Sequence, residues 1–213
     1  MKALDLTVQP VLSVEGLCFR YPERELFKNW SGCIRPGLTL LLGGDGSGKT
    51  SLLRLLAGAL SADAGELQVH STRLRDDPAA YRQQVFWVDP RSEAFEQISP
   101  VAYFQSLHDI YPKFDKQRLG ELSTGLSLTE HMEKPMYMLS TGSKRKVWLA
   151  AAFASGASVT LLDDPFAALD KPSIRFVREL LAGAARDPSR ACLLAHYEAP
   201  GDVPLTAVIK LDI

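Results

Sequence analysis

Four short apolar runs lie far apart along the chain, and each is bounded by turn-forming or charged residues. They span Leu38–Leu42, Val85–Val88, Val159–Leu162 and Ala191–Ala195. Short apolar runs without polar alternation are typical of strands that are covered on both faces, as in a parallel sheet. The pattern therefore predicts a buried parallel sheet.

Helical patterns lie between these runs. Thr50–Leu60 carries leucines that form a wide apolar face, and Lys144–Ala154 carries Val147 and several alanines in a similar arrangement. Strands that alternate with helices predict a doubly wound α/β core. The segment Val11–Tyr21 differs, because its apolar positions recur with a period near two, which predicts an antiparallel strand with one wetter face.

The stretch Asp89–Leu139 interrupts this alternation with a helical but irregular pattern. Four prolines punctuate it, at Pro90, Pro100, Pro112 and Pro135. We interpret it as a helical insertion that splits the core in two. The expected organisation is one domain over residues 1–213, with a core and N-terminal β-subdomain from 1–88 and 156–213 and a helical subdomain from 89–155.

The composition is that of an ordinary globular protein. Of the 213 residues, 46% are hydrophobic and 23% are charged, which allows a sizeable core. The formal net charge of -1 argues against a dedicated nucleic-acid binder, because such proteins usually carry a strongly basic face. Cys18, Cys33 and Cys192 lack a metal-binding spacing and are interpreted as reduced thiols of a cytosolic protein.

No segment is predicted to cross a membrane. The most apolar stretch, Trp148–Leu162, is interrupted by polar residues and glycine, whereas a spanning helix needs about 18 apolar residues. The segment Met1–Pro10 carries Asp5 and lacks the long apolar core of a signal peptide. If the chain works at a membrane, it is expected to dock onto a partner that crosses it.

A glycine-rich loop joins the predicted strand Leu38–Leu42 to the predicted helix Thr50–Leu60. Its candidate phosphate-binding residues are Gly43, Gly44, Asp45, Gly46, Ser47, Gly48, Lys49, Thr50 and Ser51. The loop matches GxxxxGK[ST] between a strand and a helix, the context in which this motif binds a nucleotide. Glycines let backbone N–H groups converge on phosphate oxygens, and the helix N-terminus adds its positive dipole end.

Two side chains of the loop have more specific expected roles. Lys49 would reach the β- and γ-phosphates, and the Thr50 hydroxyl would join the Mg²⁺ ligands. The alternative is a glycine-rich turn with a solvated lysine, but the flanking strand and helix argue against it. The predicted fold is therefore a P-loop NTPase core, a mostly parallel sheet flanked by helices, with an N-terminal antiparallel β element and an inserted α-helical subdomain.

Two carboxylates, Asp163 and Asp164, end the apolar run Val159–Leu162. Ligands of an open parallel sheet bind at the carboxyl ends of its strands. Because adjacent strand residues point to opposite faces, we expect different roles: Asp163 holds Mg²⁺ as a hard oxygen ligand, and Asp164 polarises the attacking water. The alternative is a pair of acidic turn residues before Pro165, which is common.

Four further features follow in order. Leu139–Ser143 resembles the LSGGQ signature, Phe166–Asp170 resembles a D-loop, and Leu193–His196 resembles a strand that ends in a switch histidine. Tyr21 stands where an aromatic residue would contact adenine. Together with the phosphate loop, this set resembles the ATP-binding subunit of an ABC transporter. The resemblance runs from about Val11 to His196.

The resemblance implies a head-to-tail dimer, expected to be a homodimer, with ATP between the phosphate loop of one chain and the signature of the other. It assigns ATP contacts to Ser140, Thr141, Gly142 and Asp170, and it makes His196 a sensor of the γ-phosphate, catalytic together with Asp164 and Lys49. It also implies a multispanning membrane permease as partner and a cytoplasmic, peripheral position on the inner face of the cell membrane. For His196 and Tyr21, plain structural packing is the alternative.

The chain departs from the family pattern at four positions. Thr141 and Ser143 replace a glycine and the glutamine of the signature. Asp164 replaces the usual glutamate, and its shorter side chain allows slow hydrolysis, since a displacement of about 1 Å can cost roughly 100-fold in rate. Asp89 replaces a glutamine that normally reaches Mg²⁺, and its carboxylate could still bind the ion.

Two features have both a functional and an ordinary interpretation. Lys144, Arg145 and Lys146 crowd the first turns of a helix, where cations oppose the dipole. They either await an anion from a partner or face water. The aromatic residues of Phe95–Tyr111 form either a docking surface for the permease or part of the core.

Several functions remain open. The leading hypothesis is an ATPase that drives a transporter, with export slightly favoured because little sequence follows His196. The alternative is a non-transport ABC scaffold or regulator that binds ATP with weak turnover. A GTPase or small-molecule kinase shares the loop motif but explains neither Leu139–Ser143 nor Phe166–Asp170. A DNA-repair relative would need a longer insertion than Asp89–Leu139.

Overall fold

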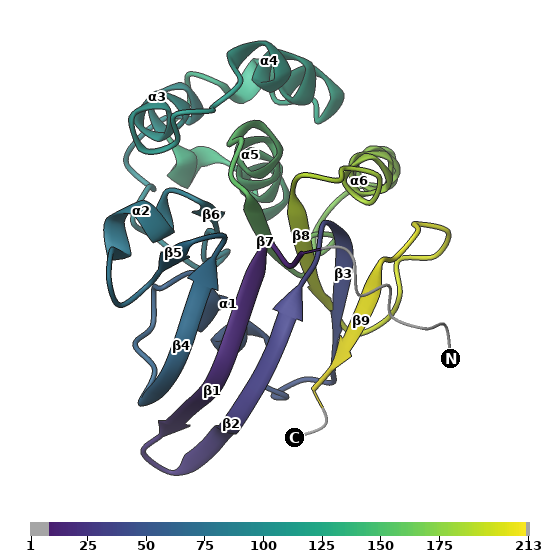
Figure 1. Cartoon of the computed structure of the whole chain (residues 1–213). Coiled ribbons are helices and arrows are strands. Elements are labelled where there is room, and N and C mark those ends of the chain that lie inside the picture. Colours follow the sequence, from purple (N-terminus) through teal and green to yellow (C-terminus); the bar gives the residue numbers. More distant parts are fainter. Residues whose placement is uncertain (1–8, 212–213) are drawn as a thin grey trace.

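Two sheets and a set of helices make up the protein in the computed structural model, which describes residues 9–211 (Figure 1). The segment Met1–Pro10, for which no signal peptide is expected, lies almost entirely outside these residues. Within the described range every helix is too short or too polar to span a bilayer. All three cysteines lie in this range and none forms a disulfide, as expected.

The first sheet is antiparallel and has four strands in the order β2-β1-β4-β5. Its strands are β1 (Leu12–Tyr21), β2 (Arg24–Ile34), β4 (Ala64–Val69) and β5 (Thr72–Arg73). Strand β1 pairs with both β2 and β4, so the alternating pattern of the opening segment is confirmed as an antiparallel strand.

The second sheet is parallel and has five strands in the order β6-β7-β8-β3-β9. Its strands are β3 (Gly37–Leu42), β6 (Val85–Phe86), β7 (Val159–Asp163), β8 (Ala191–His196) and β9 (Ala207–Lys210). The four apolar runs are confirmed as strands, although β6 is two residues shorter than predicted. Neighbouring residues of one strand enter different cores: Leu40 and Leu194 pack on one face of the sheet, Leu41 and Leu193 on the other.

Helix α1 (Lys49–Leu56) packs between the two sheets, with its leucines in the same core as β1, β4 and one face of the parallel sheet. The predicted continuation to Leu60 is wrong. Gly58 adopts a positive φ of 64°, which ends the helix. Helix α2 (Pro78–Arg82) closes this end: the Tyr81 hydroxyl donates to the Leu56 carbonyl at 2.8 Å, and Arg82 donates to the Gly58 carbonyl.

The other helices lie on the opposite side of the parallel sheet (Figure 1). They are α3 (Pro100–Ile110), α4 (Lys116–Gly125), two 3₁₀ turns (Thr129–His131 and Met136–Met138), α5 (Thr141–Ala154) and α6 (Lys171–Ala184). Helices α5 and α6 pack on the strands of this sheet, and α3 and α4 pack on α5. Helix α5 begins directly after Ser140, whose hydroxyl caps it by accepting from the Ser143 N–H.

The aromatic residues of Phe95–Tyr111 belong to the core. Tyr103 and Phe104 are 1% and 3% exposed, and Tyr103 and Phe95 both pack on Trp148 of α5. Of the two interpretations of this segment, the ordinary one is therefore confirmed.

Substitution of Tyr81 by Phe tests the connection between α2 and α1. The side chain is fully buried, so removing its hydroxyl leaves the Leu56 carbonyl at the helix end without this donor. We expect a loss of about 1–2 kcal/mol in the free energy of unfolding, measured by urea denaturation. The matched control Tyr137→Phe, at a side chain 58% exposed, should change it by less than about 0.5 kcal/mol. Equal effects of the two substitutions would contradict the role of this hydrogen bond.

Candidate functional site

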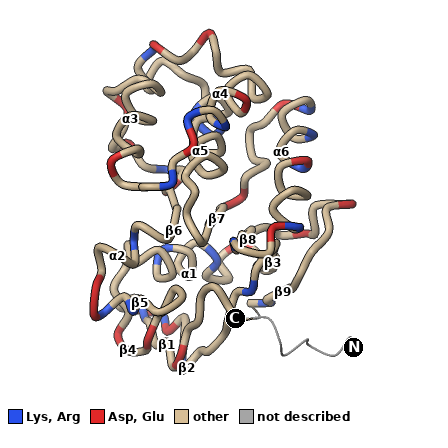
Figure 2. The backbone as a smooth tube through the Cα atoms, turned by 45° about the horizontal axis from the view of Figure 1, so that its top comes forward, with Lys and Arg blue, Asp and Glu red and all other residues tan. Residues whose placement is uncertain are grey.

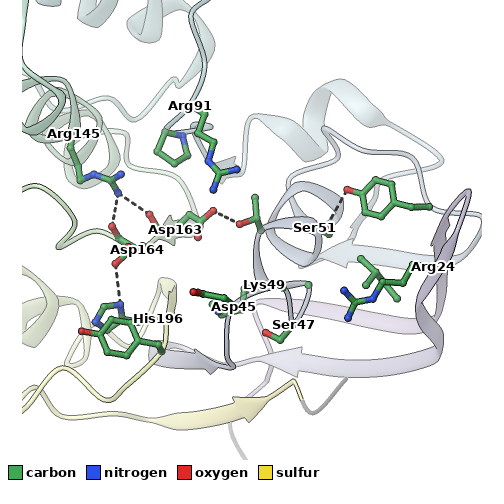
Figure 3. A pocket seen from close by; sticks show the side chains of 17 residues that line it. Arg24, Asp45, Ser47, Lys49, Ser51, Arg91, Arg145, Asp163, Asp164 and His196 are labelled. Atoms are coloured by element: carbon green, nitrogen blue, oxygen red, sulfur yellow. Dashed lines mark hydrogen bonds and ion pairs between the residues drawn. The ribbon is translucent and has the colours of Figure 1, made fainter.

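A cavity of about 590 Å³ lies at the carboxyl-terminal edge of the parallel sheet (Figure 3). Three parts of the chain supply most of its walls: the loop residues 45–51, the strand ends 163–164 and 196–197, and Tyr21, Arg24 and Leu26 of the β1–β2 hairpin. Pro90, Arg91 and Arg145 complete the lining. The register of the parallel strands brings the first two parts together, since Leu42 pairs with His196 and Asp163 pairs with Ala195.

The glycine loop has the conformation that its sequence demands. Gly46 and Gly48 adopt positive φ values of 73° and 87°, which side chains rarely tolerate. At Gly43 an added Cβ would lie 2.3 Å from the Ser47 Oγ. The Lys49 ammonium folds back over the loop and donates to the Gly43 and Gly44 carbonyls at 2.6 and 2.8 Å. The loop is thus a curled backbone with a cation at its mouth, the form of a phosphate-binding nest.

Thr50 and Asp163 join the loop to the end of β7. The Thr50 hydroxyl donates to the Asp163 carboxylate at 2.7 Å. Burial raises the pKa of Asp163, and the hydrogen bond from Thr50 opposes this shift. The two groups are hard oxygen donors of the kind that Mg²⁺ prefers. Residues 9–211 contain no group of three or more His, Cys, Asp or Glu side chains that could hold a metal ion, so an ion here would need further ligands from phosphate and water.

Asp164 points away from Asp163, as the alternation along a strand predicts (Figure 3). Its Oδ1 lies 3.1 Å from the Nδ1 of His196, but the two atoms are not aligned as a hydrogen bond. The His196 side chain is only 7% exposed, whereas that of Asp164 is 49% exposed. A buried imidazole therefore stands beside a carboxylate that water can reach.

The backbone at Asp164 is strained, because its φ is 44° in the left-handed region. Hydrogen bonds to other segments hold it there. The Asp164 N–H donates to the Ala195 carbonyl at 3.0 Å, and the Arg145 guanidinium donates to the carbonyls of both Asp163 and Asp164. Burial lowers the pKa of Arg145, with the two neighbouring aspartates opposing the shift.

Tyr21 lies at the far end of the cavity, 38% exposed. Its hydroxyl is 3.2 Å from the Ser51 Oγ, and its ring packs edge-on against Phe19 at 4.9 Å between centroids. The ring therefore packs on the hairpin and also lines the cavity.

The signature residues Ser140, Thr141 and Gly142 do not line this cavity. Gly142 packs so closely on the D-loop that an added Cβ would lie 2.4 Å from the Ala168 carbonyl oxygen. Asp170 also lies outside the cavity and caps α6, where its carboxylate accepts from the Ser173 N–H at 2.9 Å.

The predicted metal ligand Asp89 does not line the cavity either. Its carboxylate accepts from the Arg91 N–H at 3.0 Å and so stabilises its own turn. The structure places Arg91, rather than Asp89, in the cavity wall.

The interpretation that Lys144, Arg145 and Lys146 simply face water is wrong. Lys144 pairs with Glu96 at 2.5 Å, Lys146 pairs with Asp170 at 2.6 Å, and Arg145 binds backbone carbonyls. Partners distant in sequence already bind these side chains, and the anion from a partner chain stays a prediction. Charged residues of both signs are spread over the whole fold (Figure 2).

The predicted site did not include six residues that line the cavity: Arg24, Leu26, Pro90, Arg91, Arg145 and Tyr197. Tyr197 follows the predicted histidine directly and packs against it at a tilt, with 4.3 Å between ring centroids, so its position alone could have suggested it. Arg24 and Arg91 belong to no recognised motif, and no sequence signal pointed to them, whereas Arg145 was noted as one of the cations at the start of α5.

Comparisons with known proteins agree with this geometry. A family model described as "ABC transporter" matches residues 27–167. The chain is 30% identical to a cytochrome c biogenesis ATP-binding export protein, CcmA, of Yersinia pseudotuberculosis, covering 88% of this chain and 87% of that protein. It is 34% identical to the CcmA of Nitrosococcus oceani, over 89% and 87% of the two chains.

Solved structures share the fold. The ATP binding subunit of an ABC transporter superposes with a TM-score of 0.79 at 21% identity, over 88% of this chain and 79% of that chain. A bacterial Atm1-family ABC exporter with ATP bound superposes with a TM-score of 0.78 at 16% identity, over 99% of this chain and 38% of that chain.

Substitution of Asp170 separates a capping role from other roles. Asp170→Ala removes the acceptor for the Ser173 N–H, and we expect it to lower the free energy of unfolding by about 1 kcal/mol. Asp170→Asn keeps a capping oxygen, so its loss should be clearly smaller in the same chemical denaturation experiment. Equal losses for the two variants would show that the charge, rather than the cap, stabilises this end of α6.

Proposed function

Because this chain belongs to the ABC transporter family, it is an ATP-binding and ATP-hydrolysing subunit, and we propose that it drives export through a separate membrane permease. The observation that carries the proposal is the curled loop with Lys49 at its mouth, tied through Thr50 to the acidic end of β7. The names of the similar export proteins support the direction of transport. ABC ATP-binding subunits work with a membrane component, and we place this chain at the inner face of the membrane, in the cytoplasm.

The proposed nucleotide runs along the cavity with its base at Tyr21 and its terminal phosphate near Lys49. The backbone N–H groups of residues 43–51 surround the phosphates, and the start of α1 adds its dipole. Lys49 already binds two carbonyls, so a phosphate would exchange these contacts for stronger charge-assisted ones.

A second copy of the chain would complete the site. Ser140, Thr141 and Gly142 lie at an exposed helix start outside their own cavity, where they can serve the nucleotide of a partner. Asp170 is already used as a cap and as the partner of Lys146, so we assign it to the support of the adjoining D-loop rather than to ATP. In this proposal, residues 89–155 act as a helical subdomain and 1–88 with 156–213 as the nucleotide-binding core.

Thr50 and Asp163 would hold Mg²⁺, which supplies charge neutralisation to the phosphates when bound. The oxygen chemistry of this pair fits the ion, and their 2.7 Å hydrogen bond places the two donors together. Asp89 is left out of the proposed ligand set, because its carboxylate is engaged in a turn and does not line the cavity.

Asp164 and His196 are the proposed hydrolytic pair. The half-exposed Asp164 carboxylate can accept a hydrogen bond from the attacking water and orient it. The buried His196 beside it holds the carboxylate and can donate to the terminal phosphate. The shorter side chain of aspartate favours slow turnover, which also suits the alternative function of an ATP-dependent scaffold or regulator. Co-purification with a multispanning membrane protein distinguishes transport from regulation.

Lys49→Ala tests the phosphate contact. Removing the ammonium should weaken MgATP binding by at least about tenfold, since hydrogen bonds to charged groups contribute about 1.5–3 kcal/mol. Isothermal titration calorimetry measures the affinity directly. The control Lys116→Ala, at an exposed position on α4, should bind as the wild type does. Full retention of affinity in Lys49→Ala would refute the proposed site.

Asp164→Asn tests the hydrolytic pair with little disturbance of the backbone, because asparagine also tolerates a positive φ. We expect the rate of phosphate release to fall by about 100-fold or more, with MgATP affinity retained. The control Asp109→Asn lies at a side chain 89% exposed and should leave the rate unchanged. An unchanged rate in Asp164→Asn would mean that another group orients the water.

A further inference from the structure

The cavity contains four cations, and they differ in how they are held. Arg24, Lys49, Arg91 and Arg145 all line it. Lys49 and Arg145 donate to backbone carbonyls of the cavity wall. For the guanidinium groups of Arg24 and Arg91, the described part of the chain offers no hydrogen bond or ion pair. Two positive side chains therefore face the cavity without a partner of their own.

Arg91 is held in place by its turn. The Asp89 carboxylate accepts from the Arg91 N–H at 3.0 Å, and the Ser92 N–H donates to the Asp89 carbonyl at 2.9 Å. Pro90 occupies the second position of this turn, where its fixed φ is favourable. Further along the same loop, Glu96 pairs with Lys144 of α5. The loop is thus anchored on both sides of Arg91, and little backbone freedom is lost when its side chain binds a ligand.

The two unpartnered arginines lie at different ends of the cavity (Figure 3). Arg24 lies on the side of Ser51, with its Nη1 3.9 Å from the position of a Cβ added at Gly46 of the loop. In this view Arg91 extends from the opposite wall on the side of Asp163, and both residues line the cavity. Since Asp163 is hydrogen bonded to Thr50, Arg91 lies at the end where the proposed β- and γ-phosphates meet the loop.

A guanidinium at this point suits a phosphate better than a carboxylate of the protein. No ion pair joins Arg91 to Asp163 or Asp164 among the described residues, although all three line the same cavity. A planar guanidinium can donate two parallel hydrogen bonds to a phosphate group, which gives both strength and orientation. The negative charge of a bound polyphosphate would also stabilise an unpaired cation in a partly enclosed cavity.

We propose that Arg91 binds the terminal phosphate of ATP and makes this site discriminate ATP from ADP. The proposal rests on the function proposed above. Arg91 acts here as a binding residue that supplies a positive charge from the loop between β6 and α3. The sequence predicts Asp89 of the same loop as a metal ligand, but Arg91 is the residue that lines the cavity.

The test compares Arg91→Ala and Arg91→Gln with the wild type. Calorimetry measures the affinities for ADP and for the non-hydrolysable analogue adenylyl imidodiphosphate, each with Mg²⁺. Loss of a charge-assisted contact should weaken analogue binding by about tenfold to 100-fold, with ADP affinity changed by less than about twofold. The control Arg175→Ala, at an exposed position on α6, should match the wild type for both ligands.

The outcomes separate the two proposals. Equal weakening for both ligands, or no change for either, would overturn the assignment of Arg91 to the terminal phosphate and leave the ATP site in place. Failure of the wild type to bind either ligand would remove the proposed site itself, and the role of Arg91 with it. Thermal unfolding of the variants checks their fold, and the glutamine variant, which keeps a longer polar side chain, guards against loss of the alanine variant through misfolding.

Discussion

The register of three parallel strands is the constraint on which the site depends. Leu42 of β3 pairs with His196 of β8, and Ala195 of β8 pairs with Asp163 of β7. This alignment places the glycine loop, the histidine and the two aspartates along one edge. Because side chains alternate along a strand, a slip of one residue in β7 would turn Asp163 away from Thr50 and Asp164 away from His196. Both faces of the sheet are buried in large apolar cores, which penalise such a slip.

The same edge contains the main local strain of the site. Asp164 adopts a positive φ and is held there by the carbonyl of Ala195 and the guanidinium of Arg145. Aspartate and asparagine adopt this conformation more readily than longer residues. The structure therefore gives a physical reason for a short aspartate side chain at this position. The slow hydrolysis proposed for this site is therefore connected with the backbone conformation of Asp164 as well as with the length of its side chain.

The parts that could be predicted from sequence are those that local chemistry determines. Continuous apolar runs predicted four strands, and the glycine-rich motif predicted a curled loop between a strand and a helix. The rest depends on contacts between distant residues. Strand β9 is a half-exposed edge strand of four residues and gives a weak pattern. The end of α1 depends on Gly58 and on contacts with α2. The ion pair of Lys144 depends on Glu96, 48 residues earlier in the chain. Arg91 lines the cavity and Asp89 does not, because the Asp89 carboxylate is hydrogen bonded within its own turn.

Recognition of the polyphosphate tail, rather than of the base, is the central claim, and a series of nucleotides tests it most directly. Calorimetric titration of the wild-type protein with adenosine, AMP, ADP and a non-hydrolysable ATP analogue, each with Mg²⁺, gives the contribution of every phosphate. The loop, Lys49 and the Thr50–Asp163 pair predict weak or undetectable binding of adenosine and AMP and a steep rise from AMP to ADP to the ATP analogue. Equal affinity for adenosine and the analogue, or no binding of any of them, would contradict the account.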